Sequence, residues 1–314
     1  MENFGQYLTV QDASKKLGVS VSTLRNWDKS GKLKSQRNPY NDYRIYRQED
    51  IEAVLQTLHA GKAAKPIVQF PKKDIGEFTN KVIQGDCLEV MATMPDKSVD
   101  MILCDLPYGT TQNKWDSVID LNQLWAEYTR IIKDNGVIVL TSQGVFTARL
   151  ILSNEEWFKY KIVWIKSKST NFLNAKKQPL RKHEDICVFY KKQPTYNPQM
   201  TQGESYDKGI RKDQYTGSYG DFKPRHVKSD GQRYPNDVVF YEEEADDCVY
   251  FKTAESEGTV YHPTQKPVEL GRYLIRTYTN EGDIVLDNAC GSGSFIKASE
   301  LENRRFIGIR AAEK

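Results

Sequence analysis

The sequence contains few cysteines and has no long apolar run. Its five cysteines are scattered, odd in number and never spaced as CxxC, which argues against a disulfide framework or a zinc site. No stretch approaches the roughly 18 apolar residues that a membrane-spanning helix needs. The N-terminus also lacks the basic and apolar regions of a signal peptide. We therefore expect a cytoplasmic protein that binds no metal and has no membrane partner.

The composition is that of an ordinary globular protein, but its charge is unevenly distributed. The 314 residues are 39% hydrophobic and 28% charged, enough for one large domain and a small one, with a net charge of +3. Residues 159–235 contain 17 Lys and Arg against 7 Asp and Glu, interleaved with aromatic residues. This composition fits a segment that follows a nucleic-acid backbone, although a solvated loop region would explain it as well.

Residues 1–60 form a first predicted domain. Thr9 and Asp12 are spaced to begin a helix that continues to Leu17, and Ser20 can cap a second helix over residues 21–29. Residues 43–46 are typical of a wing, and a third helix is expected over residues 48–58. The pattern T-V-x-x-A-S-K-x-L-G-V-S-x-x-T-L-R-x-W, followed by Y-R-I-Y, resembles the winged helix-turn-helix of MerR-type regulators. The resemblance implies that this domain binds DNA; a protein–protein module on the same helices is the alternative.

The DNA contacts that this resemblance implies fall on the second helix and the wing. Four residues would lie in or near the major groove: Ser22, Thr23, Arg25 and Asn26. Arg44 in the wing would contact a phosphate.

A linker is expected over residues 61–80, followed by a larger domain over residues 81–314. Strands are predicted at residues 82–84, 99–104, 137–141, 160–165, 185–190, 284–287 and 306–309. Helices are predicted at 88–94, 121–133, 146–152, 268–278 and 295–302. This alternation indicates an α/β fold with a mainly parallel sheet and helices on both faces. Residues 191–258 lose the periodicity and are expected to form an irregular insert.

Two of the predicted strands end in residues that could carry chemistry. Asp105-Leu106-Pro107-Tyr108 follows the strand at 99–104, and ligands bind at this edge of open α/β sheets. A carboxylate beside an aromatic ring suits a planar substrate with an amino group, although a capped turn explains the four residues equally well. Asp287 ends another strand and leads into Gly291-Ser292-Gly293. That turn could hold a nucleotide-like cofactor or could simply be a tight connection.

Taken together, four motifs resemble the beta-class amino-methyltransferases of DNA. In chain order they are Gly85-Asp86, Asp105-Leu106-Pro107-Tyr108, His262-Pro263-Thr264-Gln265-Lys266-Pro267 and Asp287-Asn288-Ala289-Cys290-Gly291-Ser292-Gly293-Ser294. The resemblance implies a Rossmann-like, seven-stranded methyltransferase sheet with circularly permuted motif order. It also implies that the insert at 191–258 recognises the target, that S-adenosylmethionine is the cofactor and that double-stranded DNA is the partner. Monomer and homodimer both remain open.

The family's site residues can be carried over position by position. Asp105 and the backbone carbonyl of Leu106 or Pro107 would accept the hydrogens of the target amine, and Tyr108 would stack on the base. The implied cofactor contacts are Asp86, Thr264, Lys266, Asp287, Asn288, Ala289, Gly291 and Gly293.

The resemblance also bears on the target base. Asp105 in the first position is similar to the adenine-N6 enzymes, and cytosine-N4 methylation is the alternative. After the last strand, Arg310 stands where the family usually has an acid for the cofactor ribose, and Arg cannot accept a hydrogen bond. A DNA-binding regulator with a weak or inactive methyltransferase domain is therefore a further hypothesis.

Overall fold

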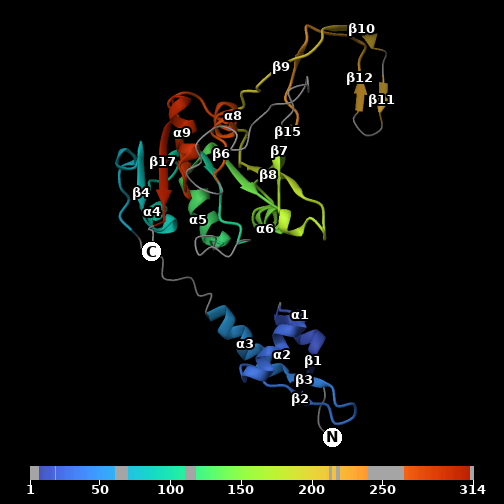
Figure 1. The fold of residues 1–314 in the computed structure, drawn as a ribbon. Helices are drawn as coiled ribbons and strands as arrows, with labels where there is room; N and C mark the ends of the chain where they lie inside the picture. Colours follow the sequence, from blue (N-terminus) through green and yellow to red (C-terminus); the bar gives the residue numbers. More distant parts are fainter. Residues whose placement is uncertain are drawn as a thin grey trace. The chain divides into compact units, whose positions relative to one another are not determined.

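A computed structural model divides the chain into two compact units, residues 1–69 and 70–314, which we describe separately (Figure 1). It describes residues 7–17, 19–60, 70–109, 118–211, 214–216, 220–239 and 265–311. The expected linker over residues 61–80 extends too far. Ile75–Glu77 forms a 3-10 turn, and Phe78 is buried in the core of the second unit. In the described part of the chain, no helix is long and apolar enough to cross a membrane.

The first unit has the predicted helix-turn-helix and wing. Its elements are β1 (Tyr7–Thr9), α1 (Val10–Leu17), α2 (Val21–Ser30), β2 (Gln36–Arg37), β3 (Arg44–Arg47) and α3 (Gln48–Ala60). The strands form an antiparallel sheet in the order β1-β3-β2, in which β1 was not expected. Ala13, Leu24, Tyr46 and Ile51 are fully buried between the helices and the wing.

The predicted helix caps explain why these helices begin where they do. The Thr9 hydroxyl donates to Asp12 Oδ2 at 2.7 Å, while the Asp12 amide donates to Thr9 Oγ1 at 3.2 Å. The Thr23 amide donates to Ser20 Oγ at 3.1 Å. These side chains pair with N–H groups that have no partner within the first turn of a helix.

The second unit is built on one eight-stranded sheet with the order β15-β7-β8-β6-β5-β16-β17-β4. All seven predicted strands are present, and the two-residue β15 adds an eighth at the edge. The strands are β4 (Lys81–Gln84), β5 (Val99–Cys104), β6 (Ile132–Ser142), β7 (Phe158–Thr170), β8 (Arg181–Phe189), β15 (Val238–Val239), β16 (Ile284–Asp287) and β17 (Arg305–Arg310). Neighbouring strands are parallel except where β8 pairs with β6 and β7.

Helices cover both faces of this sheet, as the alternating pattern predicts (Figure 1). The helices are α4 (Cys87–Thr93), α5 (Leu121–Ile131), α6 (Val145–Ser153), α8 (Val268–Tyr278) and α9 (Ser294–Leu301). Along β5, Ile102 and Cys104 pack with α4, α5 and α6, whereas Met101 and Leu103 pack with α8 and α9. This alternation places apolar side chains on both faces of a buried strand.

The insert is more regular than the sequence indicated. Where the structure describes it, the insert contains three antiparallel pairs, β9 with β14, β10 with β13 and β11 with β12. Their bounds are β9 (Thr201–Gln202), β10 (Tyr206–Arg211), β11 (Gln214–Thr216), β12 (Gly220–Phe222), β13 (Arg225–Ser229) and β14 (Gln232–Arg233). Four of these six strands have only two or three residues, too short for the apolar alternation that would predict a strand. The longer β10 and β13 are mostly polar and charged and do not alternate.

The hairpin between β7 and β8 extends past the sheet edge where β6 ends. Ser142, the last residue of β6, is aligned with Asp185 of the antiparallel β8. The first residues of β8 and the connection at 171–180 therefore lie beyond the carboxyl end of β6. The 3-10 turn Phe172–Asn174 lies in this connection, and Phe172 and Leu173 are 75% and 83% exposed.

Candidate active site

The two predicted site motifs share one edge of the sheet. Asp105 directly follows β5, Asp287 ends β16, and the two strands are parallel neighbours with Ile102 aligned to Leu286. Because the carboxyl ends of adjacent parallel strands meet at the same edge, the motifs at Asp105 and Gly291 lie beside one another. Asp105 and Asp287, which are 182 positions apart in the sequence, are thus brought to one edge of the sheet.

Three side chains hold the Asp105 carboxylate. Its Oδ1 accepts from the Tyr108 hydroxyl at 2.9 Å and from the Thr141 hydroxyl, and its Oδ2 accepts from Lys266 Nζ at 2.8 Å. The Tyr108 hydroxyl also lies 3.0 Å from Thr141 Oγ1. Asp105 remains partly exposed, with a side-chain exposure of 26%. The carboxylate is therefore fixed in position and still accessible.

Tyr108 is packed as well as hydrogen-bonded. Its ring stacks on Phe146 with centroids 5.2 Å apart and an interplanar angle of 29°, and Lys266 Nζ lies 5.5 Å from its centroid. Burial, with the nearby Asp105 carboxylate, raises the pKa of the Tyr108 hydroxyl well above its usual value. The hydroxyl is therefore a neutral donor at physiological pH. Leu106, which directly follows Asp105, has its side chain buried in the core.

Lys266 connects Asp105 to further buried charges. Its Nζ lies 3.2 Å from Glu184 Oε2, and Lys166 Nζ lies 3.1 Å from Glu184 Oε1. Glu184, Lys166 and Thr141 were not predicted from the sequence as site residues. The only signal for Glu184 was a charged residue directly before the buried run of β8. Thr264, the other residue expected from this motif, lies outside the described residues.

The loop after β16 has the geometry that a nucleoside-like group requires. Gly291 and Gly293 have φ values of 44° and 83°, a region that side-chain-bearing residues rarely adopt. Gly293 begins α9 without a side-chain cap, so the first amide groups of the helix face the loop. A Cβ at Gly308 of neighbouring β17 would lie 3.1 to 3.3 Å from Val82, Ile296 and Cys290. The residues present therefore fit the cofactor that the resemblance implied.

Asp287 is the buried acid of this loop. Its side chain is 3% exposed, and the Ala289 amide donates to its Oδ1 at 3.2 Å. Burial raises the pKa of Asp287 to about 7, since the opposing amide and thiol hydrogen bonds only partly offset it. Asn288 is also buried, and its Oδ1 accepts from the Tyr128 hydroxyl at 2.5 Å, which attaches the loop to α5.

The two remaining positions on the cofactor side have local partners. Asp86 caps α4, because its Oδ1 accepts from the amides of Leu88 and Glu89 at 2.8 and 3.3 Å. Arg310 is the exposed last residue of β17, aligned with Gln84, and its carbonyl accepts from the Gly85 amide. Burial raises the pKa of the Cys290 thiol to about 11, and the neighbouring Arg310 opposes that rise. Arg310 thus lies at the loop where the family's acid was expected.

The predicted DNA contacts of the first unit lie around the start of α2. Arg25 and Asn26 are exposed, whereas the hydroxyls of Ser22 and Thr23 lie 2.7 and 2.9 Å from the capping Ser20 Oγ. Arg44 pairs with Asp28 of α2 through its Nε at 2.9 Å. That ion pair ties the wing to the second helix of the motif.

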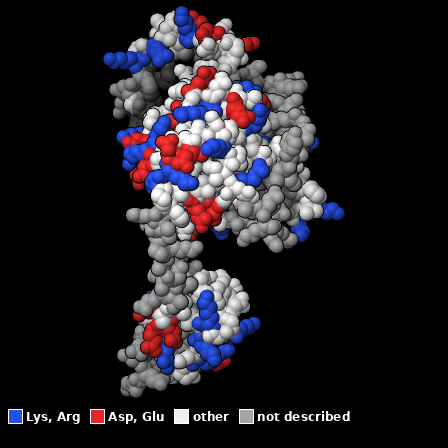
Figure 2. Space-filling view, turned by 90° about the vertical axis from the view of Figure 1, so that its left-hand side faces the viewer, with Lys and Arg blue, Asp and Glu red and all other residues white. Residues whose placement is uncertain are grey.

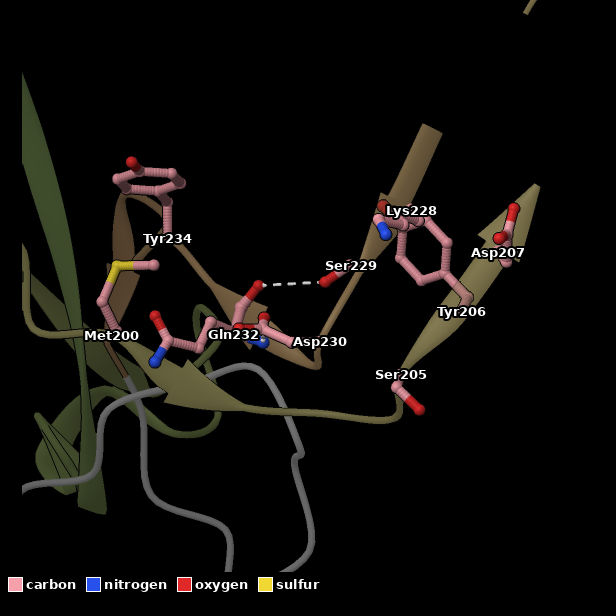
Figure 3. Close-up of a pocket in the computed structure, with 9 residues that line it drawn as sticks. All are labelled: Met200, Ser205, Tyr206, Asp207, Lys228, Ser229, Asp230, Gln232 and Tyr234. Carbon is pink, nitrogen blue, oxygen red and sulfur yellow. Dashed lines mark hydrogen bonds between the residues drawn. The ribbon is translucent and has the colours of Figure 1, made fainter. Parts of the chain in front are cut away.

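The insert forms an open cleft of about 830 Å³. Figure 3 shows Tyr234 and Met200 on one side of it and Tyr206 with Asp207 on the other. Arg233 and Lys208 both lie within cation–π distance of the Tyr206 ring, at 5.0 and 4.8 Å. The cleft therefore combines aromatic surface with hydrogen-bonding groups.

Positive charge is distributed unevenly over the second unit. Figure 2 looks onto the side that carries β4 in Figure 1, and there Lys and Arg are interspersed with Asp and Glu. In contrast, residues 166–183, at the end of the β7–β8 hairpin, contain six Lys and Arg and no Asp or Glu. The exposed members of this basic hairpin are Lys168, Lys176, Lys177, Arg181 and Lys182.

Comparison with known proteins is consistent with this geometry. A family model described as DNA methylase matches residues 99–314, more than half of the chain, and one described as MerR family regulatory protein matches residues 9–46. Type II methyltransferase M.HinfI of Haemophilus influenzae is 24% identical over 278 residues, covering 77% of this chain and 68% of that protein. DNA adenine methyltransferase YhdJ of Escherichia coli (strain K12) is 29% identical over 249 residues, covering 74% of this chain and 79% of that protein.

The fold is also found among solved structures of DNA methyltransferases. The cytosine-N4-specific PvuII DNA methyltransferase covers 74% of this chain and 82% of its own, with 14% identity and a TM-score of 0.50.

Proposed function

This chain belongs to the DNA methylase family, and from that premise we propose that it transfers a methyl group from S-adenosylmethionine to the N6 amine of adenine in a specific sequence of double-stranded DNA. The observation that carries the proposal is the Asp105 carboxylate, held by Tyr108, Thr141 and Lys266 beside the glycine loop. The similarity to YhdJ, which is named a DNA adenine methyltransferase, supports adenine as the target.

The chemistry asks little of the protein beyond positioning. S-adenosylmethionine supplies a methyl group that is already activated on a sulfonium. The exocyclic amine of adenine is a poor nucleophile, because its lone pair is delocalised into the ring. Asp105 and the backbone carbonyl of Leu106 or Pro107 would accept its two hydrogens and favour the tetrahedral, nucleophilic nitrogen. After transfer, the N6 proton leaves through the Asp105 carboxylate to water.

The target base must leave the duplex to reach Asp105. Unstacking a base costs a few kcal/mol, and stacking on an aromatic side chain offsets part of that cost. Tyr108 is the ring beside Asp105, and Phe146 supports it from one side. We infer that the base stacks against Tyr108 after its hydroxyl has positioned the carboxylate.

The DNA would follow the surfaces that carry positive charge and aromatic rings. The basic hairpin extends past the edge where the site lies, and the cleft of the insert supplies Tyr206 and Tyr234 together with groups that can pair with base edges. The winged unit adds Arg25 and Asn26 on an exposed face of α2. The cofactor loop would hold S-adenosylmethionine through Asp287 and the first amides of α9.

The proposal is tested by transfer of labelled methyl from S-adenosylmethionine to unmethylated DNA, with Asp105→Ala as the control. Nuclease digestion of the product separates N6-methyladenine from N4-methylcytosine. The proposal expects N6-methyladenine from the unmodified chain and none from the variant. If cofactor binds but no adenine-containing duplex is labelled, the chain is instead a DNA-binding regulator, the alternative that Arg310 suggests.

A further inference from the structure

The buried charges of the site extend beyond the catalytic carboxylate. Lys266 Nζ lies 2.8 Å from Asp105 Oδ2 and 3.2 Å from Glu184 Oε2, and Lys166 Nζ lies 3.1 Å from Glu184 Oε1. The side chains of Lys166, Lys266 and Glu184 are 7%, 10% and 12% exposed. Four groups thus alternate in sign from Lys166 to Asp105, and we call them the charge chain.

The charge chain draws on four separate segments of the fold. Asp105 follows β5, Lys266 precedes α8, and Lys166 and Glu184 belong to the antiparallel strands β7 and β8. Lys166 also donates to Thr170 Oγ1 at 3.3 Å. Burying the charges of Lys166, Glu184 and Lys266 is costly, and apolar residues would often stabilise such positions equally well. A charge chain that ends on the reacting carboxylate therefore points to function rather than to stability.

We propose that Glu184 and Lys166 are positioning residues that act through Lys266 on the Asp105 carboxylate. The inference rests on the methyl transfer proposed above. Lys266 alone would neutralise much of the charge of Asp105 and weaken this carboxylate as a hydrogen-bond acceptor. Glu184 also pairs with the Lys266 ammonium, so Lys266 withdraws less negative charge from the Asp105 carboxylate. Lys166 forms a second ion pair with Glu184 and balances the charge of that carboxylate.

The Asp105 carboxylate has little acceptor capacity left for the target amine. An ionised carboxylate has about four lone-pair positions. The Asp105 carboxylate already accepts from Tyr108, Thr141 and Lys266, which leaves about one position for the target amine. The strength of that remaining acceptor depends on how strongly Lys266 withdraws charge from the carboxylate.

Lys266 and Glu184 keep their charges at neutral pH. Burial alone would lower the pKa of Lys266, but Asp105 and Glu184 raise it well above its usual value. Burial would raise the pKa of Glu184, but Lys266 and Lys166 bring it below its usual value. Lys266 is therefore a permanent cation and not a base. The titratable groups that face Asp105 are Cys104 of β5, Tyr108 of the same loop, Glu184 of β8, Lys266 before α8 and Asp287 of β16.

The first test compares Glu184→Gln with Asp185→Asn. Asp185 is the adjacent buried carboxylate of β8, but it pairs with Lys161 and Thr147 and lies outside the charge chain. With cofactor saturating, we expect single-turnover methyl transfer to fall about tenfold in Glu184→Gln, the size expected for weakening one charged hydrogen bond. Asp185→Asn should stay within about threefold, and both should bind S-adenosylmethionine with nearly unchanged affinity.

The second test asks whether Glu184 acts through Lys266. Lys266→Met removes the cation that joins the two carboxylates, so a further Glu184→Gln substitution should change the single-turnover rate by less than about twofold. Lys266→Arg keeps the charge, and Glu184→Gln should again slow methyl transfer in that background. A purely structural role of Glu184 would lower the rate in both backgrounds.

Two results would overturn the inference while leaving the proposed function intact. One is equal loss of activity in Glu184→Gln and Asp185→Asn. The other is an equally large loss from Glu184→Gln in the Lys266→Met background and in the unmodified chain, when the unmodified chain is active and the variants melt normally. If the unmodified chain binds cofactor but methylates no DNA, the proposed function fails and this inference fails with it.

Discussion

The Tyr108 hydroxyl lies 2.9 Å from Asp105 Oδ1, so the ring expected to stack on the base is bonded to the carboxylate expected to bind its amine. Phe146 supports the same ring at a centroid distance of 5.2 Å. Positioning and stacking are thus two separable contributions of one residue.

Substitutions of Tyr108 should separate its effect on the Asp105 carboxylate from its stacking on the target base. Tyr108→Phe keeps the ring on Phe146 and removes the hydroxyl, so methyl transfer should slow by about tenfold while binding of the extruded base is retained. Tyr108→Ala also removes the ring and should weaken base binding by a further 1–3 kcal/mol or so. Fluorescence of 2-aminopurine at the target position reports base extrusion. Equal fluorescence for both variants would contradict the stacking role.

Thr141→Val should reduce methyl transfer without loss of the fold. Thr141 is fully buried at the end of β6, and its hydroxyl donates to Asp105 Oδ1 and lies 3.0 Å from the Tyr108 hydroxyl. Valine has nearly the same shape, so the change mainly removes a hydrogen bond to a charged group, which contributes about 1.5–3 kcal/mol. We expect at least a tenfold slower single-turnover rate. Thr141→Ser should recover most of that rate, and equal rates for the two variants would exclude a role for the hydroxyl.

Asp287→Asn should stabilise the protein, and increasingly so at higher pH. Burial raises the pKa of Asp287 from 3.8 to about 7, so its contribution to stability is complete below pH 3.8 and is lost as the pH rises to about 7. The advantage of the variant in free energy of unfolding should grow by roughly 2–3 kcal/mol between about pH 5 and pH 8. Urea denaturation at both pH values measures it. The same variant should also bind S-adenosylmethionine more weakly. A difference in stability that does not change with pH would contradict the raised pKa of Asp287.

Neutralising the basic hairpin should weaken DNA binding in a salt-dependent way. Lys176 and Lys177 are exposed in the connection between β7 and β8. If each contacts a phosphate, its replacement by Ala should reduce the slope of log K against log salt by about one. Lys297→Ala on α9 is a matched control, because Lys297 is also exposed but pairs with Glu300. If the slope is unchanged when both Lys176 and Lys177 are replaced by Ala, the DNA does not contact the basic hairpin.

The sequence was sufficient to predict the features that depend on local pattern. The strands before Asp105 and Asp287 are short apolar runs ended by turn residues, and both are where the pattern placed them. The caps at Thr9 and Ser20 follow from spacing alone. The predicted end of α5 was less accurate. The helix was expected to continue to residue 133, but it stops at Ile131 and β6 begins at the next residue.

The partners of Asp105 could not be predicted in the same way. Thr141 and Glu184 reach the site only because β6 and β8 pair with each other beside β5, a relationship that depends on sheet order. Lys266 was assigned to the cofactor from its motif, and its contact with Asp105 comes from the tertiary fold. Asp86 was likewise assigned to the cofactor, and its role as the cap of α4 depends on where that helix begins.

The most direct measurement is methyl transfer by Asp105→Asn. The substitution keeps the size of the side chain but removes the charge that Lys266 and the target amine both bind. Transfer of labelled methyl to adenine should fall by about a hundredfold or more, while S-adenosylmethionine binding and melting temperature remain near those of the unmodified chain. Methyl transfer at the unmodified rate by Asp105→Asn would contradict the account.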